Sequence, residues 1–142
     1  MTITIGQMQG AIAQFWGAAI AKNLYAISLL VSTDLKATYQ VTINGVKAPV
    51  KNLDFEQYIA ELKQMFGAFQ LALSTTVNYD PTKFKLSNGE ATWTVDYMQN
   101  LQIEAGTMTS TGTQTWTFNG VQFVALSVIE NDKTPQSKSA LV

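Results

Sequence analysis

The hydrophobic pattern of the chain changes its period near Leu71, and this change constrains the fold more than any other feature. Before it, apolar residues recur at the three- and four-residue spacing of amphipathic helices; after it, they alternate with polar residues as in half-buried strands. Helices followed by a run of strands are typical of α+β domains, in which helices pack on one face of an antiparallel sheet. We therefore predict a single α+β domain over residues 1–142, with 134–142 as a loose C-terminal tail.

Three helices are expected in the N-terminal half. The first carries its apolar stripe over 8–20, and a shorter one follows over 24–31. The third begins after Asp54, an N-cap residue with a glutamine three positions later, as in a capping box. Between the second and third helices, an extended run leads into Asn44-Gly45, a dipeptide typical of two-residue hairpin turns.

Turn signals divide the second half into strands. Asn88-Gly89 and Asn119-Gly120 predict two further hairpins, and Gly106 marks another. The segment 91–103 alternates cleanly between an apolar and a polar face, so one face should be buried. The last strand, 121–130, is apolar on both faces, and we expect both to be covered.

The strand that begins near Gly106 has an unusual composition. Threonine occupies every second position from Thr107 to Thr117, so all six threonines share one face. Ser110, Gly112 and Gln114 lie on the opposite face, which we expect to point inward. The threonine face is β-branched and weakly polar, and we predict that it forms the outer surface of the sheet.

A sheet of such long strands can bury one face against three helices only by curling around them. The expected shape is a cone, which leaves room for a pocket. Gln114 is the most informative inward residue, because burying an unpaired amide costs about 1–3 kcal/mol and so calls for a ligand, water or protein partner. The remaining inward rings either line this pocket or simply fill the core; they are Phe15, Trp16, Tyr39, Tyr58, Phe66, Trp93, Tyr97, Trp116 and Phe123.

The composition removes several kinds of chemistry. The chain contains no Cys, His or Arg, which excludes thiolate nucleophiles, Ser-His-Asp triads, histidine metal sites and guanidinium clamps. Nine lysines against ten acidic residues give a net charge of −1, so we expect no nucleic-acid partner. The apolar stretch 12–31 is interrupted by polar residues and follows no basic segment, so we expect no membrane association and a cytoplasmic location. We predict neither a metal nor a cofactor.

Proton transfer would then depend on carboxylates or tyrosines. Asp34 lies where the second helix gives way to a strand and could approach the mouth of the pocket. Tyr39 and Tyr97 are the other candidates for handling a proton. Asp96 and Glu104 are expected to face outward.

The order of elements resembles that of the nuclear transport factor 2-like (NTF2-like) superfamily, which includes ketosteroid isomerases, scytalone dehydratase, limonene epoxide hydrolase and SnoaL-like cyclases. The resemblance covers roughly 7–132 and rests on the junction 21–24, the stretch 29–34, and the run from Asp34 through Asn44-Gly45 into the helix after Asp54. It implies a cone-shaped α+β barrel with a ligand pocket. It also implies that the family's usual catalytic groups are missing. The isomerase positions fall near Phe15, Val41 and Thr111, and the dehydratase histidines and the hydrolase arginine have no counterpart.

Two functions remain open. In the first, the chain is a SnoaL-like protein that binds a small apolar or aromatic molecule, whether or not it acts as an isomerase, cyclase or dehydratase, with its ligand held by Phe15, Trp16, Tyr58, Phe66, Trp93, Tyr97, Gln114 and Trp116. In the second, it is a non-catalytic homodimerising module whose cone is filled. Family members commonly dimerise through the outer sheet face, which here carries Thr109, Thr111, Thr113, Thr115, Val124 and Leu126. An open cavity lined by Gln114 and a tyrosine would favour the first function.

Overall fold

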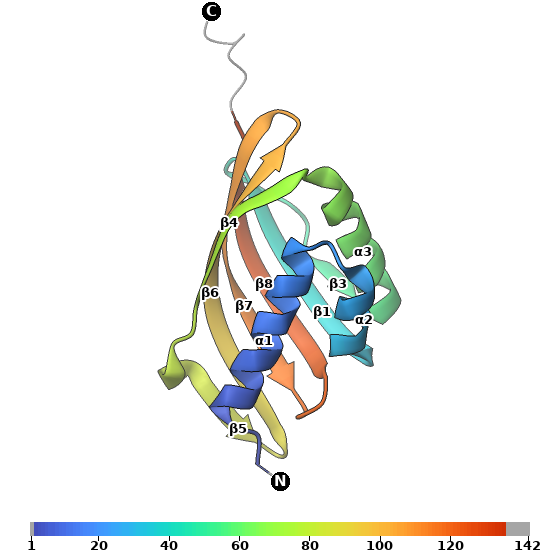
Figure 1. The fold of residues 1–142 in the computed structure, drawn as a ribbon, viewed down its shortest axis with the longest axis vertical. Coiled ribbons are helices and arrows are strands. Elements are labelled where there is room, and N and C mark those ends of the chain that lie inside the picture. The colour runs from blue at the N-terminus through green and yellow to red at the C-terminus, as the bar shows by residue number, and fades with distance from the viewer. Residues whose placement is uncertain (1, 136–142) are drawn as a thin grey trace, which may run out of the picture.

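A computed structural model describes residues 2–135 and shows three helices against a strongly curled sheet (Figure 1). The helices are α1 (Ile5–Ile20), α2 (Leu24–Leu30) and α3 (Phe55–Ala68). The strands are β1 (Val31–Ile43), β2 (Val46–Lys47), β3 (Lys51–Leu53), β4 (Leu71–Asn78), β5 (Phe84–Ser87), β6 (Glu90–Ile103), β7 (Gly106–Phe118) and β8 (Phe123–Lys133), with a short 3-10 helix at Pro81–Lys83.

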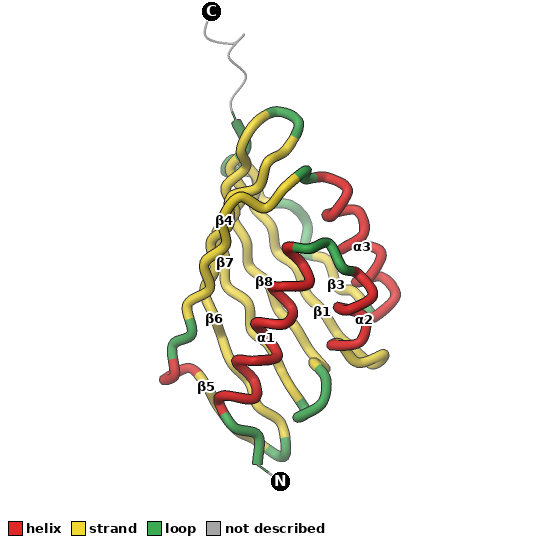
Figure 2. The backbone as a smooth tube through the Cα atoms, viewed as in Figure 1, coloured by secondary structure: helices red, strands yellow, loops and turns green. Residues whose placement is uncertain are grey.

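The sheet wraps around the helices as the alternation predicts (Figure 2). Its strand order is β2-β1-β8-β7-β6-β4, with β3 added beside β1 and β5 beside β6. Every described pair is antiparallel except β1 and β8, which run parallel, so the sheet is mixed rather than wholly antiparallel. Since a parallel pair joins strands that no hairpin connects, no turn signal in the sequence reveals it. The predicted α+β class and cone-like curl are confirmed.

Hairpins form at all three predicted Asn-Gly dipeptides, but the third has a longer loop than the other two. Both residues of Asn44-Gly45 have positive φ (51° and 83°), as a type I′ turn requires, and Asn88-Gly89 repeats this geometry. The hairpin at Asn119-Gly120 has a four-residue loop instead. There the side-chain Oδ1 of Asn119 accepts hydrogen bonds from the backbone N–H groups of Val121 and Gln122, which closes the loop without a two-residue turn.

The helix starts follow local chemistry. Asp54 Oδ1 accepts from the Gln57 N–H at 2.8 Å, and Gln57 Oε1 accepts from the Asp54 N–H at 3.0 Å, which is the predicted capping box. Thr4 and Gln7 form a second, unpredicted box of this kind at the start of α1. None of the described helices has the length and apolar character needed to cross a bilayer.

Strand β6 buries the face predicted for it, including Trp93, Val95 and Tyr97, and the threonines of β7 lie on the other side of the sheet from the helices. Strand β8 departs from its prediction. Its outer face is partly open within this chain, because Ile129 is 54% exposed.

An irregular register at the start of β8 explains a further correction. Phe118 pairs with Phe123 but Thr117 pairs with Ala125, so one extra residue, Val124, is accommodated in β8. The extra residue reverses which side chains point inward from that point on. Leu126 is consequently 2% exposed and lies in the core rather than on the outer face.

The ordered chain extends past β8 into the predicted C-terminal tail, which was expected to begin at residue 134. The Asn44 side chain donates from Nδ2 to Thr134 Oγ1 at 2.7 Å and accepts from the Thr134 N–H at 3.0 Å. Thr134, expected in the loose tail, is therefore tied to the β1–β2 turn. Residues 136–142 of that predicted tail lie outside the described residues.

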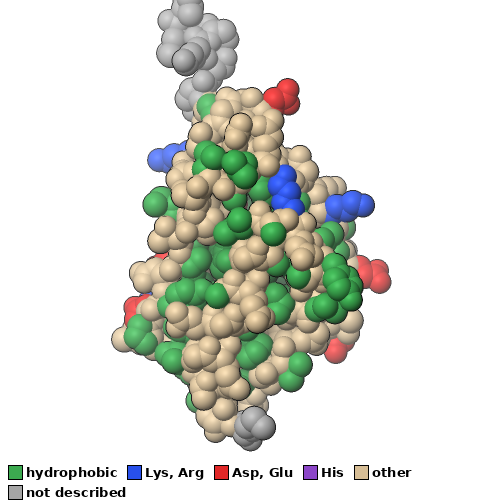
Figure 3. Space-filling view, in the orientation of Figure 1, with side chains coloured by type: hydrophobic (Ala, Val, Ile, Leu, Met, Phe, Trp, Pro, Cys, Tyr) green, Lys and Arg blue, Asp and Glu red, His purple; other side chains and the backbone are tan. Residues whose placement is uncertain are grey.

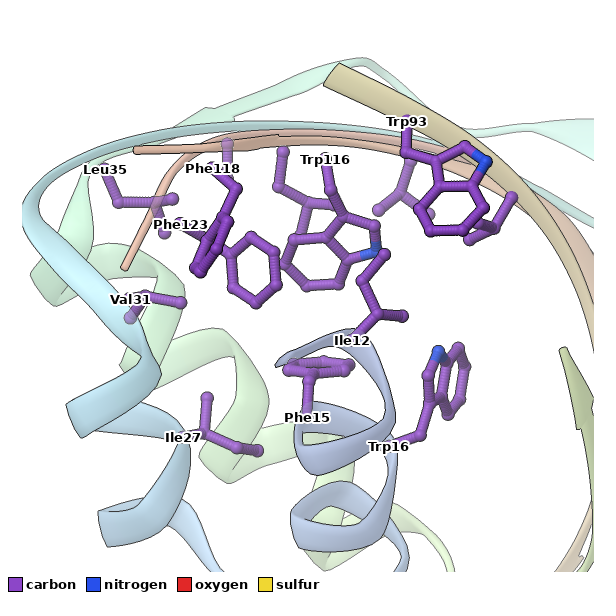
Figure 4. Packing of buried hydrophobic residues seen from close by; sticks show 14 of the residues in the cluster. Ile12, Phe15, Trp16, Ile27, Val31, Leu35, Trp93, Trp116, Phe118 and Phe123 are labelled. Carbon is purple, nitrogen blue, oxygen red and sulfur yellow. The ribbon is translucent and has the colours of Figure 1, made fainter. Parts of the chain in front are cut away.

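Aromatic rings pack closely where α1 meets β7 and β8. Figure 4 shows Phe15 of α1 pointing toward Trp116 and Phe123. The ring centre of Trp116 lies 4.8 Å from that of Phe15 and 4.4 Å from that of Phe123. Trp93 lies further along the sheet and packs on Tyr79 and Phe84. This end of the cone is filled by aromatic rings, which leaves any open space at the other end.

Candidate ligand-binding site

A cavity of about 280 Å³ lies between α1, α3 and the inner face of the sheet. Phe15 and Trp16 of α1 and Phe66 of α3 contribute aromatic rings to its helical wall. Figure 3 shows apolar side chains spread over the face that α1 crosses, with the charged groups mostly near its margins. The wall formed by the sheet is more polar than the helical wall, because it carries most of the cavity's polar groups.

The sheet wall is organised around a glycine. Tyr97 of β6, Gly112 of β7 and Glu130 of β8 are directly opposite one another in adjacent strands. Because Gly112 has no side chain, the Tyr97 side chain crosses β7, and its hydroxyl donates a hydrogen bond to Glu130 Oε1. A Cβ at position 112 would lie 2.6 Å from the Ile129 carbonyl oxygen and 2.7 Å from the Tyr97 hydroxyl oxygen. The glycine therefore makes room for the Tyr97–Glu130 contact.

The neighbouring rows complete this wall. Gln99, Ser110 and Asp132 form the next row across the same three strands, and all three line the cavity. On the other side of the glycine row lies Gln114, whose Oε1 accepts a hydrogen bond from the Trp116 indole N–H at 3.1 Å. The hydrogen-bond partner expected for the buried Gln114 amide is thus supplied, at its oxygen, by the protein.

Burial governs the electrostatics of the wall. It raises the pKa of Glu130 to about 8. A side-chain hydrogen bond with Asp132 and the charge of Asp132 act in the same direction, while the hydrogen bond from Tyr97 opposes the rise. Burial is also the main cause that raises the pKa of Tyr97 and of Tyr39, with the negative charge of Glu130 adding to it. The tyrosines therefore act as neutral hydroxyl groups, whereas the Glu130 carboxyl can gain or lose a proton close to neutral pH.

Three buried polar atoms at the cavity have no hydrogen-bond partner among the described residues. They are Trp16 Nε1, Ser110 Oγ and Asp132 Oδ1. Leaving a buried polar group unpaired costs about 1–3 kcal/mol, so their common position around one cavity is informative. Together they offer one N–H donor, one hydroxyl and one carboxylate oxygen to a molecule in the cavity.

The predicted ligand-binding residues separate into two groups. Phe15, Trp16, Phe66, Tyr97 and Gln114 line the cavity, as does the proton-handling candidate Tyr39. The other three, Tyr58, Trp93 and Trp116, are fully buried and do not line it.

Their position along the cone explains the difference. Trp93 and Trp116 are directly opposite each other on β6 and β7, at the filled end, whereas the cavity begins further along the same strands. Tyr58 points from α3 toward Tyr39, with ring centres 6.2 Å apart. Alternation identified the buried face correctly, but it carries no information about where along a strand packing ends and space begins.

The carboxylates at the cavity are not those expected. Asp34 is exposed on β1 and is not part of the lining. Glu130 and Asp132 are each 8% exposed and were missed, because the extra residue in β8 determines which side chains point inward. A usable signal was present, since Glu130 and Asp132 continue the every-second-residue series of Leu126 and Val128.

Comparisons with known proteins agree at the level of fold. No protein-family model matches the sequence, and a search of curated proteins finds no match either. Among solved structures, a putative scytalone dehydratase from Novosphingobium aromaticivorans has a TM-score of 0.71 at 12% identity, covering 94% of this chain and 89% of its own.

Two further solved structures share this fold. An NTF2-like protein from Cytophaga hutchinsonii has a TM-score of 0.58 at 13% identity, covering 90% of this chain and 98% of its own. An epoxide hydrolase from M. tuberculosis, similar to limonene epoxide hydrolase (LEH-like), has a TM-score of 0.60 at 10% identity, covering 88% of this chain and 83% of its own. The resemblance inferred from the order of elements is confirmed in three dimensions, and the chain has the NTF2-like fold.

Proposed function

We propose that this protein binds a small molecule with a largely apolar body in the cavity between α1, α3 and the sheet. The observation that carries this proposal is the set of three unpartnered polar atoms, on Trp16, Ser110 and Asp132, around a space of about 280 Å³. Aromatic rings on the helical wall would bury the body of such a molecule, and the polar atoms would orient it.

An open cavity distinguishes this function from that of a purely structural module. A filled cone was the expected feature of a module that serves only dimerisation, and the cavity lined by Gln114, Tyr39 and Tyr97 argues against it. Solved structures with this fold include a putative dehydratase and an epoxide hydrolase-like protein, which is consistent with a small-molecule site.

Proton transfer to or from the bound molecule would fall to Glu130. Asp34 is exposed and away from the cavity, and the pKa of both Tyr39 and Tyr97 is raised above its ordinary value, chiefly by burial. The Glu130 carboxyl combines a place in the lining with a pKa of about 8.

The binding proposal is tested with Prodan, a neutral naphthalene dye whose emission shifts to the blue in apolar surroundings. We expect saturable binding to the wild-type protein, with a blue shift. Ala19 of α1 lines the cavity, so Ala19→Phe should weaken binding at least about tenfold by occupying the space. Ala13, on the exposed side of the same helix, provides the matched control, and Ala13→Phe should leave the affinity within about twofold.

Two results would contradict the proposal. One is the absence of binding by Prodan and by a panel of flat neutral molecules of similar size. The other is equal weakening by the Ala19 and Ala13 substitutions, since dye bound at the surface has no reason to distinguish them.

A homodimer through the outer sheet face stays a prediction. The exposed side chains there include Thr111 and Ile129, and Thr113 is half-buried. Leu126, predicted to be part of that surface, lies in the core instead.

A further inference from the structure

The cavity contains acidic groups but no cation. Glu130 and Asp132 both line it, whereas none of the lining residues is Lys, and the sequence contains neither Arg nor His. Lys22 lies close by but is already engaged with Phe69, at the edge of the lining. Its Nζ donates to the carbonyl oxygen of Phe69 and lies 4.5 Å from the centre of the Phe69 ring. A carboxylate pair of this kind, buried without a counter-ion, is costly even when it shares a proton.

The surrounding rings favour a positive charge. Trp16 and Tyr97 line the cavity with ring centres 5.1 Å apart and planes inclined at 49°, and Phe15, Tyr39 and Phe66 add further rings. The face of an aromatic ring attracts a cation through its quadrupole, and sites that combine several rings with a carboxylate are well suited to ammonium groups.

The unpartnered atoms show where such a group would lie. Asp132 Oδ1 and Ser110 Oγ have no partner among the described residues, and they belong to side chains that are 8% and 1% exposed. Both are on the row of the sheet wall next to Glu130. A cationic head at this position would contact both carboxyl groups, and its apolar body would extend toward the helices.

We propose, building on the function proposed above, that the ligand is an organic ammonium ion whose charge is held by Glu130 and Asp132 and enclosed by the aromatic rings of the cavity. An inorganic ion fits less well. The described residues contain no group of three or more acidic, His or Cys side chains able to hold a metal, and hydrated divalent ions favour oxygen ligands over ring faces.

The preference of the cavity for a positive charge is tested with two probes of nearly identical shape, benzyltrimethylammonium and its uncharged carbon analogue neopentylbenzene. Each is titrated as a competitor of Prodan. We expect the ammonium probe to bind at least about tenfold more tightly than the neutral one, although it is the more strongly hydrated. In the double variant Glu130→Gln and Asp132→Asn this preference should disappear, while the neutral probe still binds and so reports that the cavity is intact.

The affinity for the ammonium probe should also depend on pH. The probe itself does not titrate, and a cation is bound best when Glu130 is ionised, so its affinity should rise several-fold from about pH 6 to about pH 9. Besides Asp132 on its own strand, the titratable groups that face Glu130 are Tyr97 of β6 and Tyr39 of β1, and the residues that α1 and α3 contribute to the cavity are not ionisable. In Glu130→Gln the rise should be absent.

The outcomes separate the two proposals. If neither probe nor Prodan binds, the small-molecule site itself is refuted. If the neutral probe binds as tightly as the ammonium probe, or more tightly, the site stands and the cationic ligand is refuted. Displacement of the ammonium probe by millimolar Mg²⁺ or Ca²⁺ at constant ionic strength would also overturn the assignment, in favour of a metal ion.

Discussion

Replacing Glu130 by glutamine is expected to remove most of the pH dependence of the protein's stability between about pH 5 and about pH 9. Burial raises the pKa of Glu130 to about 8, so between its ordinary value and about 8 the folded chain holds a proton that the unfolded chain has released. The free energy of unfolding must therefore fall as the pH rises through this range, by up to about 5 kcal/mol in total, and level off above it. The glutamine side chain would carry no titrating proton and can still accept the hydrogen bond from Tyr97.

The measurement is urea denaturation at a series of pH values, followed by tryptophan fluorescence. At the alkaline end the Glu130→Gln protein should be the more stable of the two, and at about pH 5 the two should be similar. Glu104→Gln is the control, because Glu104 is an exposed carboxylate at the β6–β7 turn and its replacement should leave the profile of the wild type unchanged. A wild-type stability that stays flat or increases across this range would show that Glu130 is not held in its protonated form.

The second large effect is expected at Gly112. The Gly112→Ala substitution would place a methyl group against the Ile129 carbonyl and the Tyr97 hydroxyl, in a part of the sheet that cannot easily move. We expect a loss of about 3 kcal/mol in the free energy of unfolding, together with displacement of Tyr97 from Glu130. The adjacent outward residue provides the comparison, since Thr111→Ala on the exposed face should cost less than about 1 kcal/mol.

A double-mutant cycle identifies the source of this loss. Tyr97→Phe removes the hydroxyl that the new methyl group would meet, so the cost of Gly112→Ala should be smaller in the Tyr97→Phe background than in the wild type. Strictly additive effects would mean that the crowding arises from the Ile129 backbone alone. In that case the glycine would not be needed for the Tyr97–Glu130 contact.

Structural features that depend on residues close together in the sequence were predictable. The capping box at Asp54, the type I′ turn at Asn44-Gly45 and the buried face of β6 each depend on residues within a few positions of one another. The same holds for Gln114, whose inward direction follows from alternation along β7. The curl of the sheet also followed, because strands this long can bury one face against so few helices only by bending around them.

Features that depend on non-local packing were not predictable in the same way. The parallel pairing of β1 with β8 joins segments that no turn connects, and the cavity begins only where the rings around Trp116 end. The inward direction of Glu130 and Asp132 depends on the accommodation of Val124 as an irregularity in β8, for which the sequence carries no turn residue or proline as a marker. The carboxyl groups most relevant to function were therefore the ones missed.

The register of β8 has an evolutionary consequence. Deleting one residue from its regularly paired part, such as Ser127, would leave the β7–β8 hairpin in place but exchange the two sides of the strand beyond that point, turning Glu130 and Asp132 to the outer face and presenting Ile129 and Asn131 to the cavity. Gain or loss of a single codon could thus convert an acidic chamber into a neutral one in a single step. On such a scaffold, ligand preference can diverge by insertion and deletion as readily as by point substitution.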